Sequence, residues 1–285
     1  MRTRSIDGLL LVDKPAGVTS HDVVAIARRT LGVKRMGHAG TLDPFATGLL
    51  VLLAGRATRL LPYLDGEPKV YEASIRFGSE TRTDDMTGEE THAAPLPSPE
   101  SVDLAIAQLT GSFQQLPPAY SAKQVDGQRA YDAARAGAPL ELRPVAVTVH
   151  EWTVTERAPD TWSVTITCGG GTYIRALARD LGRLSGSRAH LSALRRTASG
   201  PFHVADAHTL DAVSAECVHP MRDAVRSLPG QMLLPEAIER VLHGRTVPAV
   251  TSGPRSALLD EAGDLLAVAE RVGEEWQPKV VLRDR

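Results

Sequence analysis

The order of apolar and polar residues predicts a chain that mixes strands with helices. Unbroken apolar runs at 9–12 and 49–54 predict buried strands, because a strand covered on both faces carries no polar positions. Strict alternation at 69–77 predicts a strand with one buried face. Further strands are predicted at 145–149, 162–168, 191–194, 256–259, 265–269 and 279–282. Helices are predicted at 22–31, 57–64, 102–110, 129–136, 175–184, 210–226 and 234–243.

Capping and turn-forming residues mark the ends of these elements and predict two domains. Ser20 precedes the helix at 22–31 and is expected to cap it. The proline-containing segment at about 112–140 has too few large apolar residues to form a core of its own. It is therefore predicted to be an insertion that projects from the main domain. A boundary is expected at 227–230. Residues 1–227 would then form an α+β domain and residues 228–285 a small β-rich domain.

The composition is that of an ordinary globular protein, with 42% hydrophobic and 23% charged residues in a chain of 285. No run approaches the roughly 18 apolar residues that a membrane span requires, and the charged first residues argue against a secretion signal. Cys168 and Cys217 have neither disulfide nor zinc spacing. Two isolated cysteines suit a reducing compartment, so a cytoplasmic protein is expected.

The net charge of −2 hides an uneven distribution along the chain. Residues 1–60 carry nine Lys and Arg against four Asp and Glu, and residues 172–200 carry six Arg against one Asp. Residues 61–119 and 201–285 are acidic. This asymmetry predicts a basic face suited to a nucleic acid, although charge blocks in a sequence need not gather in space.

The segment 37–48 surrounds one carboxylate, Asp43, with special-purpose residues. Pro44 disfavours helical backbone at Asp43, and the glycines at 37, 40 and 48 permit close approach of another group. On local grounds alone, a turn aspartate before proline is the commoner explanation. A catalytic carboxylate on a shaped loop is the alternative.

Two other charged groups are expected to be ordinary surface features. Asp84 and Asp85 lack the spacing of a calcium loop, which favours a solvated turn. Arg175, Arg179 and Arg183 recur at a spacing of four on one predicted helix face, and such faces are usually solvated. The sequence contains no metal-ligand spacing, so no metal site is expected.

Four segments, in order, resemble the TruB family of bacterial tRNA pseudouridine synthases, which act on uridine 55 in the T-loop. The segments are residues 12–20, 37–48, 69–71, and 171–175 together with 194–196. The match runs from about residue 8 to residue 200, with residues 117–122 between the motifs. It implies a pseudouridine synthase fold, in which helices flank a central, mainly antiparallel mixed sheet. The C-terminal part resembles a PUA-type RNA-binding module.

The resemblance assigns roles to residues of this chain. Asp43 would be the catalytic carboxylate, either as a nucleophile at the sugar or as a base that gives a glycal-like intermediate. A free aspartate has a pKa of about 3.9 and is ionised at pH 7, so it needs positioning and a cationic partner, which would be Arg175. Tyr71 would contact the base and help to remove the proton from C5. The predicted catalytic residues are Asp43, Arg175 and Tyr71, and the predicted substrate-binding residues are His38, Tyr71, Tyr173, Leu194 and Lys14.

Some of these roles leave alternatives open. His38 would act where the nucleotide leaves the stack, or it would be a loop histidine bonded to backbone. Lys14 would support the catalytic loop or contact phosphate. The basic stretches 28–35 and 175–196 would meet phosphates, and the segment 112–140 would be the family's thumb. Arg82 departs from the acidic residue that the family often has there.

The implied reaction exchanges one glycosidic bond for another within a single nucleotide, so no cofactor is expected. The expected partner is the T-stem-loop of tRNA, with no membrane, no obligate protein partner and a monomeric chain. One rival is a pseudouridine synthase that depends on a guide RNA. A second is a non-catalytic tRNA-binding or folding protein. A glycoside hydrolase would need two carboxylates, and no second acid has loop chemistry like that of Asp43.

Overall fold

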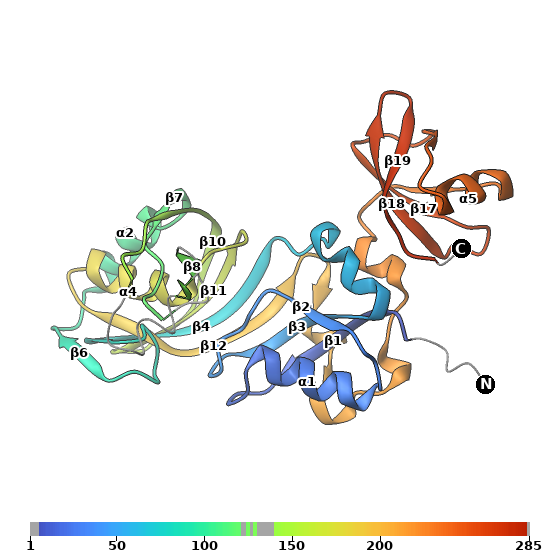
Figure 1. The fold of residues 1–285 in the computed structure, drawn as a ribbon. Helices are drawn as coiled ribbons and strands as arrows, with labels where there is room; N and C mark the ends of the chain where they lie inside the picture. The colour runs from blue at the N-terminus through green and yellow to red at the C-terminus, as the bar shows by residue number, and fades with distance from the viewer. Residues whose placement is uncertain (1–5, 121–123, 126–127, 130–139, 284–285) are drawn as a thin grey trace. The chain divides into compact units, whose positions relative to one another are not determined.

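The computed structural model describes residues 6–120, 124–125, 128–129 and 140–283. The chain forms two compact units, and Figure 1 labels many of their helices and strands. The first unit comprises Met1–Pro44, Gly48–Gly66 and Pro201–Arg285, and the second comprises Phe45–Thr47 and Glu67–Gly200. Residues 130–136 of the predicted helix at 129–136, and much of the thumb-like segment at 112–140, lie outside the described residues.

The first unit is built on two adjacent antiparallel strands, β1 (Gly8–Lys14) and β3 (Thr47–Ala54). Both strands are apolar without interruption because both faces of the pair are covered. One face packs with residues that include Ala57, Leu60 and Phe202, and the other packs with residues that include Val23 and Ala27. The prediction of two buried strands is therefore confirmed.

Helix α1 (Ser20–Thr30) follows β1 and is capped one residue earlier than predicted. Thr19 is the N-cap, and it forms a reciprocal capping box with Asp22. Ser20 is the first helical residue, so the prediction that it caps the helix is wrong. Beyond α1, a short strand, β2 (Met36–Ala39), pairs antiparallel with β3 in a segment that the sequence suggested was all loop. The predicted helix at 57–64 is a 3-10 helix, η1 (Gly55–Tyr63).

The second unit contains a five-strand antiparallel array in the order β12-β4-β11-β10-β7. These strands are β4 (Lys69–Phe77), β7 (Gly111–Gln115), β10 (Val145–Arg157), β11 (Thr161–Cys168) and β12 (Ala189–Ser199). The unit's helices are α2 (Pro99–Gln108) and α4 (Ile174–Leu184). Its short strands are β5 (Ser79–Thr81), β6 (Glu90–Ala93), β8 (Gln124–Val125) and β9 (Gln128–Arg129). Strands β10 and β12 are longer than predicted, and β5, β6 and β7 were not predicted.

The predicted helix at 210–226 is wrong. The segment instead forms three short 3-10 turns and pairs with a strand of the first unit. His219 exchanges two backbone hydrogen bonds with Leu9 of β1, at 2.8 and 3.0 Å. Pro220 follows at once and cannot donate to a helix ladder. Upstream and within the segment lie β13 (Phe202–His203), η2 (Val204–Asp206), β14 (His208–Thr209), η3 (Leu210–Ala212), η4 (Ala215–Cys217) and η5 (Met221–Val225).

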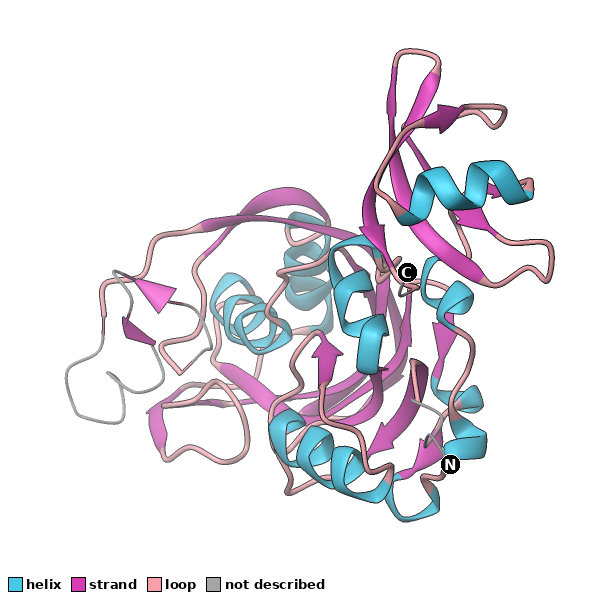
Figure 2. Cartoon of the chain, turned by 45° about the vertical axis from the view of Figure 1, so that its right-hand side comes forward, coloured by secondary structure: helices cyan, strands magenta, loops and turns pink. Residues whose placement is uncertain are grey.

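The C-terminal part is a β domain with its own five-stranded sheet, in the order β15-β17-β18-β19-β16. Its elements are β15 (Gly230–Met232), α5 (Pro235–Leu242), β16 (Val247–Pro248), β17 (Arg255–Leu259), β18 (Leu265–Val272) and β19 (Glu275–Val281). At its core the buried Trp276 Nε1 donates to Gln231 Oε1 at 2.7 Å. Figure 2 shows the sheets and helices of the chain by colour. The predicted α+β class, with a mixed, mainly antiparallel sheet and a C-terminal β domain, is confirmed. The boundary at residue 227 stays a prediction.

We expect Gly182→Ala to destabilise the protein, although alanine favours helix over glycine. A β-carbon at Gly182 would collide with the backbone nitrogen of Ala189 and lie 2.6 Å from the carbonyl carbon of Arg188. Helix α4 would have to move away from the start of β12, so we expect a loss of about 1–3 kcal/mol in the free energy of unfolding, measured with urea. Gly37→Ala, which meets nothing within 4 Å, is the control. Equal losses in the two variants would contradict this packing argument.

Candidate active site

Asp43 lies on the connection between β2 and β3, and its side chain is half-buried. The two strands pair in antiparallel register, from Met36 opposite Ala54 to Ala39 opposite Val51. The connection is therefore anchored at both ends by the same buried ladder. Gly40 has a φ of 79°, a conformation that side chains other than glycine rarely adopt. The loop's shape is thus a property of its backbone.

The backbone of the residues on both sides of Asp43 is held by residues of the segment that runs from the end of β1 to the start of α1. The buried Ser20 Oγ accepts a hydrogen bond from Leu42 N at 2.9 Å and donates one to Leu42 O at 3.1 Å. The carbonyl oxygen of Pro44 accepts from Gly17 N at 2.8 Å and from Lys14 Nζ at 3.2 Å. Sequence reasoning did not find this use of Ser20. The available signal was Thr19, which directly precedes Ser20 and is itself a good N-cap residue, so that Ser20 is not needed as the cap.

Lys14 is fully buried at the end of β1. Besides Pro44 O, its ammonium donates to Pro15 O at 2.9 Å and to Val18 O at 2.8 Å. Burial lowers the pKa of Lys14 from 10.5 to about 8, and the carboxylates of Asp43 and Asp22 oppose that change. Of the two roles that were open for Lys14, support of the loop fits this geometry, because a buried ammonium cannot reach a phosphate in solvent.

His38 lies on β2, opposite Leu52 of β3. Its ring meets the ring of His21 edge-on, with centroids 5.4 Å apart and planes at 85°. His21 is in the first turn of α1 and its side chain is exposed. Sequence reasoning did not connect these two histidines, because they are 17 residues apart and meet only through the packing of α1 against β2.

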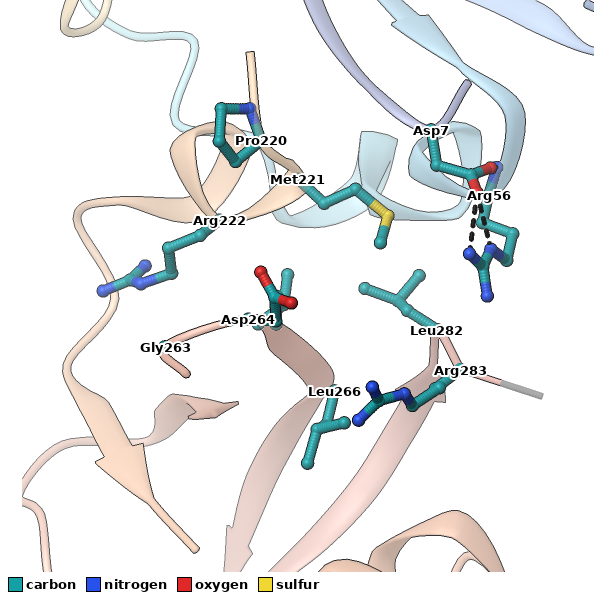
Figure 3. Close-up of a pocket in the computed structure, with 11 residues that line it drawn as sticks. Asp7, Arg56, Pro220, Met221, Arg222, Gly263, Asp264, Leu266, Leu282 and Arg283 are labelled. Atoms are coloured by element: carbon teal, nitrogen blue, oxygen red, sulfur yellow. Dashed lines mark hydrogen bonds and ion pairs between the residues drawn. The ribbon is translucent and has the colours of Figure 1, made fainter. Parts of the chain in front are cut away.

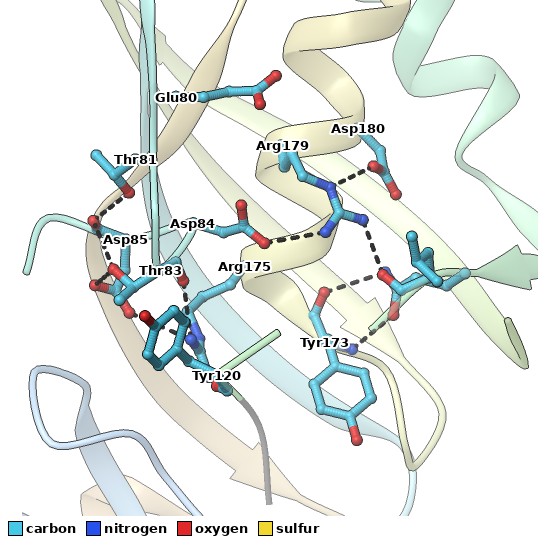
Figure 4. Close-up of polar contacts among 12 residues, drawn as sticks. Glu80, Thr81, Thr83, Asp84, Asp85, Tyr120, Tyr173, Arg175, Arg179 and Asp180 are labelled. Carbon is cyan, nitrogen blue, oxygen red and sulfur yellow. Dashed lines mark hydrogen bonds and ion pairs between the residues drawn. The ribbon is translucent and has the colours of Figure 1, made fainter. Parts of the chain in front are cut away.

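In the second unit, Arg175 is held at the start of α4 by partners that include two backbone carbonyls and a carboxylate (Figure 4). Its guanidinium donates to Thr83 O at 2.9 Å and to Tyr120 O at 2.8 Å, and it lies 3.5 Å from a carboxylate oxygen of Asp85. The other oxygen of Asp85 accepts from the Thr83 hydroxyl and from the backbone and hydroxyl of Thr87. Arg175 and Asp85 are 6% and 3% exposed, so both are buried charges.

One turn further along α4, Arg179 forms a second buried ion pair. It donates to Asp84 Oδ2 at 3.0 Å, to Asp180 Oδ1 at 2.9 Å and to Leu116 O at 2.8 Å. Asp84 has a φ of 60°, which is uncommon for a residue other than glycine. Burial raises the pKa of Asp84 to about 6, and the charge of Arg179 opposes that rise.

These pairs correct two expectations from the sequence. Asp84 and Asp85 do not form a solvated turn, and Arg175 and Arg179 are neither solvated nor available to phosphates. The physical reason is their spacing. Arginines four residues apart on α4 meet two adjacent acids of the β5–β6 connection, so each buried charge has a counterion. Arg183, the third arginine, is half exposed and pairs with Glu80 at 2.7 Å.

Two other predicted residues of the second unit, Tyr71 and Leu194, share one face of neighbouring strands. Tyr71 of β4 lies opposite Arg196 of β12, and Leu194 lies opposite Ala73. Residues at spacing two share a face, so Tyr71, Leu194 and Arg196 point to the same side. Tyr71 and Leu194 are 7% and 6% exposed.

Tyr173 is the N-cap residue of α4, and a buried glutamine of β7 holds its backbone. Its N–H donates to Gln115 Oε1 at 2.9 Å, and its carbonyl accepts from Gln115 Nε2 at 3.1 Å. Lys14, His38 and Asp43 thus belong to the first unit, and the other predicted site residues, Tyr71, Tyr173, Arg175 and Leu194, belong to the second. The pairing of Arg175 with Asp43 stays a prediction.

The hollows in the described part of the first unit include two that are lined by cations. One, of about 400 Å³, is lined by the exposed cations Arg28, Lys34 and Arg35 together with Met36 and neighbouring residues. Within the described part of the chain, these three cations have no ion pair. Exposed arginines elsewhere do have one; examples are Arg157 with Asp103 at 2.8 Å, and Arg82 with Glu89 at 3.3 Å. The hollow is therefore electropositive.

The other hollow, of about 320 Å³, lies among Asp7, Met221, Asp264, Leu282 and neighbouring residues (Figure 3). It also holds three arginines, but all three are engaged. Arg56 pairs with Asp7, Arg283 pairs with Asp260, and Arg222 donates to two backbone carbonyls. Its charges are therefore balanced, and nothing about it favours an anionic ligand.

Two family models cover the chain from residue 28 to residue 242. The TruB family pseudouridylate synthase N-terminal domain matches residues 28–174, and the tRNA pseudouridylate synthase B C-terminal domain matches residues 175–242. The tRNA pseudouridine synthase B of Thermobifida fusca (strain YX) is 49% identical over 288 residues, covering 96% of this chain and 98% of its own. The chain belongs to the TruB family. The corresponding enzyme of Arthrobacter sp. (strain FB24) is 41% identical, with 97% and 96% covered.

Solved structures agree with this assignment of the TruB fold. A chain in a Cbf5–Nop10–Gar1 complex superposes with a TM-score of 0.74 at 25% identity, covering 98% of this chain and 85% of that one. The predicted resemblance and the predicted class of enzyme are confirmed: TruB proteins are RNA pseudouridine synthases, which are isomerases. No helix within the described ranges is long and apolar enough to cross a membrane.

We expect Lys14→Met to change how stability depends on pH. The unfolded lysine keeps its proton up to a pKa of about 10.5, whereas the folded one releases it near 8. Between these values the unfolded state binds more protons, so the stability of the parent protein rises with pH. The variant lacks that rise, which is about 3 kcal/mol in total. Urea unfolding at pH 7 to 10.5 measures it, with the exposed Lys279→Met as control. Parallel curves for the Lys14 variant and its parent would contradict a buried ammonium.

Proposed function

We propose that this TruB-family enzyme converts uridine 55 in the T-loop of tRNA to pseudouridine, with Asp43 as the catalytic carboxylate. The observation that carries the proposal is that hydrogen bonds hold the backbone of both neighbours of Asp43, Leu42 and Pro44, beside a buried ammonium. Most of a carboxylate's advantage in an enzyme comes from being held in a productive position, because misplacement by about 1 Å reduces the rate about 100-fold. The relatives named tRNA pseudouridine synthase B support the choice of substrate.

The bonds in this reaction balance without a cofactor. The bond between N1 of uracil and C1′ of the ribose breaks, the base turns, and C5 bonds to C1′. The proton leaves C5, and N1 gains one. Asp43 attacks C1′ and is later displaced, or it takes a proton from C2′ and returns it. In either case it must be ionised, and the ammonium of Lys14 favours that state electrostatically.

The resemblance to the TruB family also gives roles to residues of the second unit. Arg175 would pair with the carboxylate of Asp43, and its contacts with Thr83, Tyr120 and Asp85 would keep the guanidinium in one orientation. Tyr71 would lie against the base. Leu194 is on the same face of the neighbouring strand β12, and Tyr173 is at the N-terminal end of α4. Stacking on an aromatic ring contributes about 1–3 kcal/mol per base. That is enough to hold an extruded uracil while its glycosidic bond is exchanged.

The electropositive hollow of Arg28, Lys34 and Arg35 would bind phosphates of the same RNA. Strand β2 leads from Arg35 to His38 in three residues, and a strand advances about 3.3 Å per residue. A phosphate in the hollow would therefore lie within one or two nucleotides of the base that His38 contacts. Residues 1–227 would form the catalytic domain, with a thumb at 112–140. Residues 228–285 would be a PUA-like RNA-binding domain.

We further propose that the enzyme works in the cytoplasm as a monomer, without an obligate protein partner. The main alternative is a synthase that depends on a guide RNA and protein partners; the related Cbf5 structure is of a complex with Nop10 and Gar1. A non-catalytic tRNA-folding protein is the other. Conversion of a bare T-stem-loop by the purified chain, with no guide RNA, would exclude both.

We expect Asp43→Asn to abolish pseudouridine formation, with a rate reduced by at least about a thousandfold. The amide keeps the shape of the carboxylate but can neither attack C1′ nor take a proton. Base-resolved mapping of a tRNA transcript measures the product and its position. Asp206→Asn, which changes an exposed acid of the same unit, is the control and should retain full activity. Product at position 55 with the Asp43 variant, or product only elsewhere with the parent enzyme, would refute the proposal.

We expect the double variant Lys34→Glu and Arg35→Glu to bind tRNA more weakly and with a shallower salt dependence. Each lost phosphate contact lowers the slope of log affinity against log salt by about 0.9, so two contacts lower it by about 2. Titrations at several salt concentrations measure the slope. The matched control is Arg76→Glu with Arg157→Glu, because those exposed arginines already have acidic partners. An unchanged slope in the first variant would remove the hollow from the RNA-binding surface.

A further inference from the structure

We infer that Ser20 is a positioning residue for catalysis: its hydroxyl sets the placement of Asp43 by bonding both polar backbone groups of Leu42. This inference rests on the proposed role of Asp43. Leu42 N donates to Ser20 Oγ at 2.9 Å, and Ser20 Oγ donates to Leu42 O at 3.1 Å. Leu42 O belongs to the peptide plane that enters Asp43, so the bond to that oxygen restricts the plane directly.

The described contacts give the hydroxyl of Ser20 no structural role other than bonding Leu42. Thr19 already caps α1, and its exchange with Asp22 completes the capping box. Ser20 is 1% exposed, so its hydroxyl cannot exchange partners with water. Both of its hydrogen bonds in the described part of the chain go to Leu42. A buried serine at this place therefore serves the loop that carries Asp43.

Few side chains can do this in so small a space. A hydroxyl donates one hydrogen bond and accepts others from the same atom, so one oxygen satisfies an N–H and a C=O together. Alanine would leave both groups of Leu42 buried without these partners, which is unfavourable. The loop would then move to hydrate them. The other anchor, on Pro44 O, would remain through Gly17 and Lys14, so Asp43 would be displaced while the fold stays intact.

This geometry links helix capping to chemistry. The capping box fixes the first turn of α1, that turn presents Ser20, and Ser20 holds Leu42 next to the carboxylate. A shift of about 1 Å in a reacting group is worth about 100-fold in rate. A merely structural serine would lower stability and leave the chemical step of the folded enzyme unchanged.

The test compares Ser20→Ala and Ser20→Cys with Ser256→Ala. Cysteine has nearly the size of serine but forms weak hydrogen bonds, so the second variant keeps the packing. Ser256 is equally buried and also donates to a backbone carbonyl, Pro229 O, but in the C-terminal sheet. We measure the single-turnover rate of pseudouridine formation, the Kd for tRNA, the melting temperature, and hydrogen exchange of the peptide that covers residues 37–48.

We expect the rate to fall about 10- to 100-fold in both Ser20 variants, with the Kd for tRNA changed less than about threefold. Exchange of the Leu42 amide should become faster. Ser256→Ala should lower the melting temperature to a similar extent and keep the rate. Parent-like rates in both Ser20 variants, or an equal loss of rate in Ser256→Ala, would overturn the inference. Activity in Asp43→Asn would instead refute the proposed function, so the two failures are distinguishable.

Discussion

The arrangement of the candidate site depends on the pairing of β1 with β3. Seven antiparallel pairs join the two strands, from Gly8 opposite Ala54 to Lys14 opposite Gly48. This register brings the segment that leaves β1 beside the segment that enters β3. The first of these carries Lys14, Gly17 and Ser20, and the second carries Asp43. A slip by one residue would turn every side chain of the buried strands to the opposite face, so the hydrophobic core enforces the register.

The loop around Asp43 is consequently held through its backbone. Four hydrogen bonds from three residues reach Leu42 and Pro44. This kind of support acts on the backbone groups of Leu42 and Pro44 and not on the carboxylate itself. It also explains the glycines near it, because a loop shaped by backbone contacts needs backbone freedom, as the φ of Gly40 shows.

The second unit relies on buried charges. Burying an ion is costly, and a buried pair is often no more stable than an apolar one of the same shape. Removing one partner, however, leaves an uncompensated charge and costs about 3–5 kcal/mol. The two pairs of α4 with Asp84 and Asp85 therefore act as a constraint on geometry. They orient Arg175, and they connect the turn between β5 and β6 to α4, the helix that contains Arg175.

Exposed charge follows a different pattern in the first unit. The cations Arg28, Lys34 and Arg35 surround a hollow without an acidic neighbour in the described residues, whereas most acids of the chain lie in other segments. Such a cluster repels itself at low salt, so it is maintained at some cost in stability. Binding of a polyanionic ligand would remove this repulsion between the cations. The near-neutral net charge of the chain therefore says little about its partner, and the local distribution says more.

The sequence by itself determined the fold class, the two strands of the buried core, helix α4 and the family, because these follow from periodicity and from motifs of adjacent residues. It also marked Asp43, Arg175 and Tyr71 by their motifs. Only the tertiary structure decided that Ser20 serves the loop rather than the helix cap, and that Asp84 and Asp85 are buried. It also decided that residues 210–226 form short 3-10 turns and bond to β1 instead of forming one helix. These outcomes depend on partners 20 to more than 200 positions away, such as Leu42 for Ser20 and Leu9 for His219. Local propensity contains no information about such partners.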